Sequence, residues 1–418
     1  MAATNRSESS PFIQRKGKNA ASNSDHFGLQ SWRLIYLDYN ATTPLCDEAR
    51  EAMAPYFDRF FGNPSSIHAA GREARAAIDN ARDKIAGLLG AKPHEIIFTS
   101  GGTEACNLAL LGLARSKFGH GAHIISNKAE HHAVLHTVEY LEKQEGFSVT
   151  WLDVSNDGLI DLNQLADSIR PDTRLVSVMT ANNETGVIQP IREISQICRA
   201  RGVLLHSDMV QSYGKLEIDI ACVDAASFAA HKFYGPKGAG FLYLRSGLSL
   251  QPVMFGGSHE NQRRPGTENV AGIAGMAAAA EVVSHGREGE QCRQTVLRDR
   301  LLRLIQANAP DAVLNGTSPR KLANTLNVSF VGLESEMLLI AMDLKGVCAS
   351  SGSACMVGSV SASHVLLAMG LPLERAKSAV RFSLGKHTTE AEINTAGDAI
   401  KQIIERLATR KTADYAAV

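Results

Sequence analysis

A lysine stands where an apolar run ends and a glycine-rich turn begins. The run 226–231 leads directly into Lys232, and Gly235-Pro236-Lys237-Gly238 follows before the next apolar stretch. A lysine amine loses its proton readily when it is partly buried, which suits Schiff-base chemistry. A lysine can equally reach past the end of a strand to solvent. This stretch alone therefore leaves a catalytic and a surface lysine open.

Four further apolar stretches end in polar loops that could reach the same site. These loops carry Thr103, His131, Asn183, and Asp208 with Gln211, while His231 adjoins Lys232 in the fifth. Ligands of open α/β sheets bind beyond the carboxyl ends of the strands. We therefore expect the five loops to form a single site.

Two of these loops suggest particular chemistry. Gly101-Gly102-Thr103-Glu104 stands between a strand and a helix, where glycines and free helix N–H groups can bind phosphate. The stretch matches neither dinucleotide nor P-loop fingerprints, which disfavours a nucleotide site. Asp208 could cap a helix, or it could hold a pyridine nitrogen protonated and make a pyridoxal ring a better electron sink.

Three other side chains have both a chemical and a plain interpretation. His131, His132 and His136 could ligate a metal, but the carboxylate of an HExxH motif is missing, so we expect no metal site and place His131 against a flat cofactor. Cys355 lies among small residues in SSGSAC, which favours a nucleophile over a packed thiol. Arg381 either pairs with a core carboxylate or holds a substrate carboxylate.

The order of the apolar stretches predicts an α/β fold with a large, mainly parallel sheet and a smaller α+β C-terminal domain. We expect a tail over residues 1–33, a large domain over 34–270, and a smaller domain over 271–418 that carries the cysteine loop. Helical periodicity is expected over residues 48–57, 69–89, 271–283, 288–308 and 390–408.

Composition limits the classes of partner. Among 418 residues, 43 Lys and Arg balance 43 Asp and Glu, so electrostatics gives no reason to expect nucleic acid or a membrane as a partner. No run of about 20 apolar residues suggests a membrane span. Seven scattered cysteines without a CxxC pair indicate a reducing compartment, and we expect the cytoplasm.

With these residues considered together, the chain resembles the cysteine desulfurases of the NifS/IscS type, within the class V, fold-type I pyridoxal-phosphate aminotransferase family. The resemblance runs from about residue 36 to 404. It rests on LDYNATTP, FGNPSS, FTSGGTE, AEHHAV, ANNETGVIQP, HSDMVQS, HKFYGPKG, RPGTEN, SSGSAC and RFSLG in this order.

The resemblance implies a role for each candidate residue. Lys232 would bind pyridoxal 5'-phosphate covalently and later move the Cα proton of L-cysteine, while Cys355 would take up the sulfur as a persulfide. The phosphate would be bound by Gly102, Thr103, His231 and, from a partner subunit, Thr267. His131 would stack on the ring and relay protons, and Asp208 and Gln211 would contact the ring. Asn183 would contribute both to the cofactor site and, with Arg381, to binding of the substrate carboxylate.

The same resemblance implies partners and leaves alternatives. A homodimer is expected, delivering sulfur to an acceptor or iron–sulfur scaffold protein, with a transient iron–sulfur contact at Cys355 as the one metal contact. A selenocysteine lyase and a catalytically silent scaffold of the same fold are the alternatives. Two positions depart from the family pattern: Ala229 replaces a Ser or Thr, and Met209 replaces a small residue.

Overall fold

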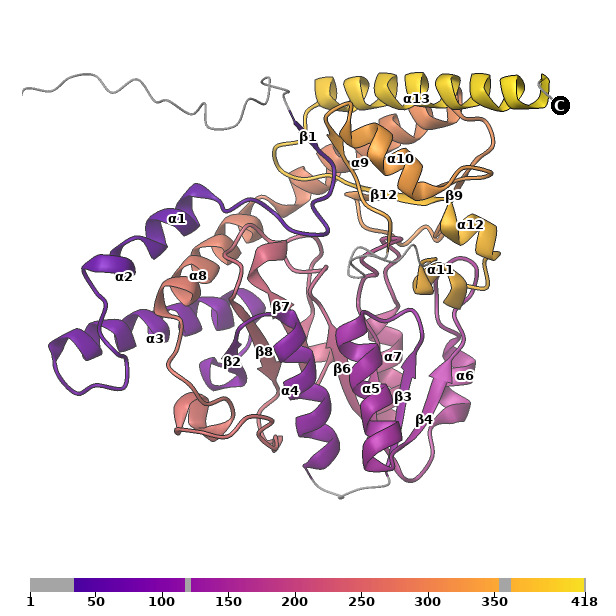
Figure 1. The fold of residues 1–418 in the computed structure, drawn as a ribbon. Coiled ribbons are helices and arrows are strands. Elements are labelled where there is room, and N and C mark those ends of the chain that lie inside the picture. Colours follow the sequence, from indigo (N-terminus) through magenta and orange to yellow (C-terminus); the bar gives the residue numbers. More distant parts are fainter. Residues whose placement is uncertain (1–33, 117–121, 353–361, 417–418) are drawn as a thin grey trace, which may run out of the picture. The chain divides into compact units, whose positions relative to one another are not determined.

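A seven-stranded sheet is the largest feature of the computed structural model, which describes residues 34–116, 122–352 and 362–416 (Figure 1). Its strand order is β2-β8-β7-β6-β5-β3-β4. Only β8 runs antiparallel to its neighbours, so the predicted mainly parallel α/β sheet is confirmed. The strands are β2 (Ile96–Thr99), β3 (His123–Asn127), β4 (Ser148–Leu152), β5 (Thr173–Ser177), β6 (Leu204–Asp208), β7 (Ala225–Ala229) and β8 (Gly240–Leu244).

Both faces of this sheet are buried, because neighbouring residues of a strand point to opposite sides. Ile97 packs in a core with α4 (Gly102–Arg115) and α5 (His132–Glu145). Phe98, the next residue, packs in a second core on the other face. The helices that contribute to this second core include α3 (Ala69–Leu89), α6 (Leu162–Ser168), α7 (Ile191–Ala200) and α8 (Val270–His285).

A three-stranded antiparallel sheet in the order β12-β10-β9 has a core of its own. It consists of β9 (Ala312–Leu314), β10 (Thr325–Phe330) and β12 (Ala379–Ser383), packed with α9 (Arg287–Asn308), α10 (Ser335–Asp343) and α13 (Glu390–Ala416). Two short helices follow one another before β12, α11 (His364–Ala368) and α12 (Leu373–Lys377). The described residues from 34 onward belong to one contact unit, and the domain boundary at residue 270 stays a prediction.

The N-terminal strand joins this smaller sheet region to the larger one. β1 (Ile35–Tyr36) pairs in parallel with β11 (Val347–Cys348), and Asp38 bridges to Ser383. This pairing directs the following turn, residues 38–43, toward the carboxyl edge of the large sheet, where Thr43 N–H donates to the His231 carbonyl.

The helix predicted over residues 48–57 is divided in the structure. α1 (Asp47–Met53) ends before Pro55, and α2 (Pro55–Asp58) begins with that proline. Proline lacks the N–H that would continue the ladder, so the first helical position suits it better than a helix interior. The other predicted helices are confirmed by α3, α8, α9 and α13, the last continuing to residue 416.

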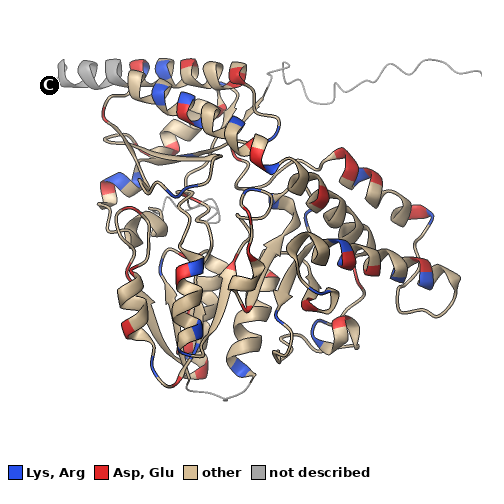
Figure 2. Cartoon of the chain, turned by 180° about the vertical axis from the view of Figure 1, so that it is seen from behind, with Lys and Arg blue, Asp and Glu red and all other residues tan. Residues whose placement is uncertain are grey.

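Acidic and basic residues are interspersed over the helices (Figure 2). In the part of the chain that the structure describes, no helix combines the length and apolarity required to span a bilayer.

Candidate active site

Lys232 belongs to a single 3-10 turn, Ala230–Lys232, that follows β7 directly. Its Nζ donates hydrogen bonds to the carbonyl oxygens of Asn40 and Ala41, both at 2.7 Å. The lysine therefore turns inward to the backbone of the 38–43 turn, and the interpretation as a surface lysine is wrong.

Asn40 connects several of the predicted residues, although the sequence marked it only as part of the LDYNATTP motif. Its carbonyl oxygen accepts from Lys232 and, at 2.9 Å, from Gln211 Nε2. Its Nδ2 donates to the Asn183 carbonyl at 3.1 Å and to Thr325 Oγ1 at 2.9 Å. The parallel pairing of β1 with β11 places this turn, and no local pattern around residue 40 could have predicted it.

Asp208 ends β6 as a buried carboxylate with one backbone hydrogen bond and one weak thiol contact. Oδ1 accepts from the Val210 N–H at 2.9 Å, and Oδ2 contacts the Cys106 thiol at 3.7 Å. Burial raises the pKa of Asp208, and the nearby charge of Lys232 opposes this shift. A cationic N–H facing this carboxylate would stabilise its charged form.

His131 caps the N-terminus of α5 with its own ring. Nδ1 accepts from the Ala133 N–H at 3.1 Å. Because a backbone N–H can only donate, the neutral ring carries its proton on Nε2. Burial, followed by the charge of Lys232, lowers the pKa of His131 to about 4, so the ring is neutral near pH 7.

Thr103 and His131 line one cavity of about 520 Å³. Thr103 stands exposed in the first turn of α4, just after Gly102. A Cβ at Gly102 would lie 2.6 Å from Val210 Cγ2, so only glycine lets the start of α4 approach the loop after Asp208 this closely. The start of α4 thus offers helix N–H groups beside the predicted site.

His231 and Thr267 occupy different places relative to this group. His231 Nδ1 lies 3.2 Å from Thr42 Oγ1, within the same turn network, and burial lowers its pKa to about 4. Thr267 is exposed and lines a separate recess of about 110 Å³ with Ser100 and Gly238. The structure therefore does not bring Thr267 to Lys232 of its own chain, and its role toward a partner subunit stays a prediction.

Arg381, from β12, reaches the site through Asn183. Nη1 donates to the Asn183 carbonyl at 3.1 Å, and Nη2 donates to Asp38 Oδ1 at 2.7 Å. Its buried Nε has no hydrogen-bond partner among the described residues. The arginine thus does pair with a carboxylate, yet it keeps N–H donors for a further anion.

Cys355 lies outside the described residues, but both borders of its segment are placed. Ser350 pairs with Arg381 through backbone hydrogen bonds at 3.1 and 2.7 Å, and Ser363 caps α11. The chain therefore enters the segment 353–361 from a residue bonded to Arg381.

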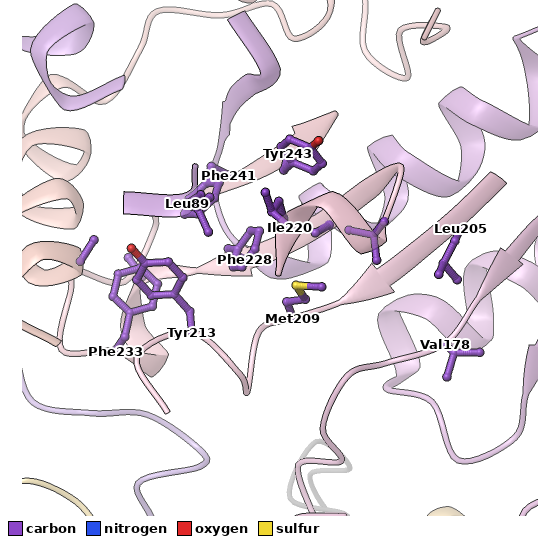
Figure 3. Packing of buried hydrophobic residues seen from close by; sticks show 14 of the residues in the cluster. Leu89, Val178, Leu205, Met209, Tyr213, Ile220, Phe228, Phe233, Phe241 and Tyr243 are labelled. Atoms are coloured by element: carbon purple, nitrogen blue, oxygen red, sulfur yellow. The ribbon is translucent and has the colours of Figure 1, made fainter. Parts of the chain in front are cut away.

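The two departures from the family pattern have different structural outcomes. Met209 is 2% exposed and packs in the apolar core with Phe228 and Ile220 (Figure 3), so it points away from Asp208. Ala229 is buried at the end of β7, close to the position a Cβ on Gly102 would take, at 3.4 Å. Met209 therefore packs in the core. The methyl group of Ala229, where the family has a Ser or Thr, faces the start of α4.

The histidines of α5 stack instead of converging on a common point. The ring centroids of His132 lie 4.8 Å from His136 and 4.4 Å from His364. Over the described ranges, no group of three or more His, Cys, Asp or Glu side chains is arranged to hold a metal ion.

Comparison with known proteins identifies the family. Residues 35–395 match the model of Aminotransferase class-V. Cysteine desulfurase IscS of Dictyoglomus turgidum is 48% identical, and the match covers 90% of this chain and 96% of that protein. Cysteine desulfurase IscS of Clostridium botulinum is 43% identical, and the match covers 89% of this chain and 94% of that protein. A solved NifS-like protein superposes with a TM-score of 0.83 at 36% identity, covering 90% of this chain and 100% of that one.

The chain therefore belongs to the class V aminotransferase family, on the branch of the cysteine desulfurases, and the resemblance seen in the sequence is confirmed. Enzymes of this branch depend on pyridoxal 5'-phosphate. The residues present fit that group: Oδ2 of the buried Asp208 carboxylate has only a thiol contact at 3.7 Å, Arg381 has an unpartnered Nε–H, and the close packing at Gly102 leaves helix N–H groups for a phosphate.

Proposed function

We propose that this protein is a pyridoxal-phosphate-dependent cysteine desulfurase, which converts L-cysteine to L-alanine and transfers the sulfur to Cys355. The observation that carries the proposal is the meeting of three segments at Asn40. Lys232 donates to its carbonyl, Gln211 donates to the same oxygen, and its side chain contacts the Asn183 carbonyl to which Arg381 also donates.

Each side chain has a role toward the cofactor in this proposal. Gly102 and Thr103 would hold the phosphate at the start of α4, with His231 and a partner subunit's Thr267 completing its contacts. Asp208 would pair with the ring nitrogen and Gln211 with the phenolic oxygen, while His131 would stack on the ring. The bound cofactor supplies an electron sink that stabilises negative charge at the substrate Cα.

The protein's own groups perform the remaining chemistry. Lys232 takes the Cα proton and returns it, because its amine lies in the same network as the substrate-binding residues. Asn183 and Arg381 orient the carboxylate of L-cysteine. Neutral His131 offers its Nε2–H as a hydrogen-bond donor, since an imidazole with a pKa of about 4 holds no second proton near pH 7.

The sulfur step requires a thiolate that can approach and then leave. The Cys355 thiolate attacks the substrate sulfur, the C–S bond breaks, and an S–S bond forms on the enzyme as a persulfide. The former β-carbon gains a proton and leaves as the methyl group of L-alanine, so no external oxidant is required. A thiol reductant or an acceptor protein then removes the terminal sulfur.

The relatives do not favour the two alternatives. Those described above are named cysteine desulfurases, so a selenocysteine lyase loses support. A catalytically silent scaffold would have no need for an inward lysine, a buried Asp208 and an Arg381 with a donor to spare.

We also propose a homodimer that works in the cytoplasm and delivers sulfur to an acceptor or iron–sulfur scaffold protein. A dimer is supported by exposed aromatic and aliphatic side chains, Phe61 at 77%, Ile67 at 92% and Phe255 at 90%, and by the exposure of Thr267 in a recess that Lys232 does not line. A reducing compartment is supported by the six cysteines of the described ranges, which are all free. Sedimentation of wild type and of Phe61→Asp tests the dimer.

The proposed function is tested by alanine and sulfide release from L-cysteine with a reductant. Wild type should release equal amounts of both products, Cys355→Ala should release neither, and Cys292→Ala, which changes an exposed thiol of α9, should behave as wild type. Equal turnover by wild type and Cys355→Ala would contradict the persulfide role. Inactivity of a wild type that has bound the cofactor would contradict the desulfurase activity.

A further inference from the structure

Lys215 is a second amine in the Asn40 network, four residues after Gln211. Its Nζ donates to Gln211 Oε1 at 2.7 Å and to Asn40 Oδ1 at 3.2 Å. Burial, followed by the charges of Lys232 and Arg381, lowers the pKa of Lys215 to about 7. Among the described residues no carboxylate forms an ion pair with it, so its positive charge is poorly compensated.

Lys215 and the Asn40 carbonyl together determine which way the Gln211 amide points. A lysine amine has only donors when charged, so the amide oxygen must face Nζ. The Asn40 carbonyl on the other side can only accept, and Gln211 Nε2 lies 2.9 Å from it. The two neighbours therefore require the same orientation, in which the amide nitrogen of Gln211 lies beside the Asn40 carbonyl that also accepts from Lys232.

Lys215 also affects Lys232 through charge. Both amines bond to Asn40, one to its side-chain oxygen and one to its carbonyl. The electrostatic interaction between two titrating sites is reciprocal, so a charged Lys215 disfavours a charge on the Lys232 nitrogen. Other titratable groups also interact with Lys232: the Asp208 carboxylate favours its charge, whereas His131 and His231 are neutral near pH 7 because burial lowers the pKa of each to about 4. The carboxylates of Asp38 and Glu290 are already paired, with Arg381 and Arg293. Asp208 is present in every Lys215 variant, so it does not alter a comparison of such a variant with wild type.

A cavity of about 390 Å³ gives Lys215 an exit for its proton. Lys215 and Lys232 both line it, together with Tyr213, Asn324 and Lys386. The cavity is roomy enough for water, and its wall carries polar groups that could bind it. Lys215 can therefore exchange its proton without displacing packed side chains.

We propose that Lys215 is a positioning residue of the cofactor site, which fixes Gln211 as a hydrogen-bond donor and opposes a second positive charge on the Lys232 nitrogen. The inference rests on the proposed function in one respect only, which is that pyridoxal phosphate binds at this site. Lys215 itself takes no part in transferring the sulfur.

The test is a pH titration of the visible absorbance of the cofactor-loaded protein, which needs no L-cysteine. In Lys215→Met the midpoint should move to higher pH by about one unit or more, because the opposing charge and the alignment of Gln211 are both lost. Lys215→Arg keeps a charge and donors, so its midpoint should lie at or below that of wild type. Cofactor affinity, measured by fluorescence, should fall several-fold in Lys215→Met only.

The matched control is Lys321→Met. Burial lowers the pKa of Lys321 to about 8, and its Nζ bonds to the Gly316 carbonyl at 3.0 Å, away from the Lys232 network. Its titration should match wild type. An unchanged midpoint in Lys215→Met, or an equal shift in Lys321→Met, would overturn the proposal. If Lys215→Met does not fold, Lys215→Gln takes its place with the same expectations. If the protein binds the cofactor but does not desulfurate cysteine, the proposed function is wrong. The pH titration can still be carried out on that protein, so this inference is tested independently.

Discussion

The Ser363 hydroxyl donates a 2.5 Å hydrogen bond to Glu184 Oε2, joining two loops 179 positions apart in the chain. The same hydroxyl accepts from the Leu366 N–H and so caps α11. On its other side Glu184 lies against Gly352, where an added Cβ would stand 1.8 Å from Oε2. Glu184 thus lies between Gly352, just before the segment 353–361, and Ser363, two residues after it.

Ser363→Ala should lower the free energy of unfolding by about 1–3 kcal/mol, since it removes a helix cap and leaves a buried carboxylate without its hydroxyl donor. Urea unfolding of the cofactor-loaded protein measures this loss. Thr395→Ala, which removes an exposed hydroxyl that bonds only within α13, should change stability by less than about 0.5 kcal/mol. Equal losses in both variants would contradict a special role for the contact of Ser363 with Glu184.

Gly352→Ala should interfere with the same hydrogen bond from the opposite side. The new methyl group must displace the Glu184 carboxylate, so Gly352→Ala alone weakens the hydrogen bond between Ser363 and Glu184. In a double-mutant cycle the two substitutions should therefore cost less together than the sum of their separate effects, by about 0.5 kcal/mol or more. Strict additivity would show that the two residues act on Glu184 independently.

Ala229→Ser should tighten cofactor binding. The position faces the start of α4, where Gly102 and Thr103 are proposed to hold the phosphate, and a hydrogen bond to a charged group contributes about 1.5–3 kcal/mol. The dissociation constant of pyridoxal phosphate should fall roughly tenfold or more. Ala225→Ser, in the same strand but in the apolar core, should give no such gain, and a gain there or none at Ala229 would contradict the assignment.

The sequence predicted the sheet, most helices and the strand-end residues because those features leave local signals. Apolar runs followed by Thr103, His131, Asp208 and Lys232 are periodic patterns that one sheet edge brings together. The position of Met209 also has a local cause, since side chains at the end of a strand alternate between its faces, although the sequence alone did not show which side had room.

The roles of Asn40 and Lys215 could not be predicted because they depend on contacts distant in sequence. Asn40 meets Lys232 across 192 positions and Thr325 across 285. Lys215 has no apolar periodicity that would mark it as buried, and only its hydrogen bonds to Gln211 and Asn40 show its place. Helix 48–57 was predicted too long because apolar periodicity outweighed the signal of Pro55.

His206 should make the protein less stable in acid. Its ring bonds to Ser177 and Ser227, and burial lowers its pKa from 6.5 to about 3. Between these values the unfolded chain binds the additional proton, so stability falls as pH decreases from about 6.5 toward 3. By pH 5 this one histidine should remove about 2 kcal/mol.

Urea unfolding at pH 7.5 and pH 5 measures the effect. His206→Asn should lose stability at pH 7.5 but show a smaller decrease on acidification than wild type, whereas the exposed His285→Asn should follow wild type at both pH values. His131 and His231, whose pKa values are also lowered, should keep part of the acid sensitivity in every variant. An unchanged acid response in His206→Asn would contradict a neutral His206 in the folded state.

Arg381→Lys should weaken the binding of L-cysteine in a protein that still folds and binds the cofactor. One ammonium cannot replace a planar group that bonds the Asn183 carbonyl and Asp38 at once and still presents a free Nε–H to a carboxylate. KM for L-cysteine should rise about tenfold or more, with cofactor loading unchanged. Arg375→Lys is the matched control, because Arg375 also makes two hydrogen bonds, to Asn315 and Leu314, but lies in the smaller sheet region away from Asn40. If KM stays constant in Arg381→Lys, or rises equally in Arg375→Lys, Arg381 serves only its pair with Asp38 and the substrate carboxylate is held elsewhere.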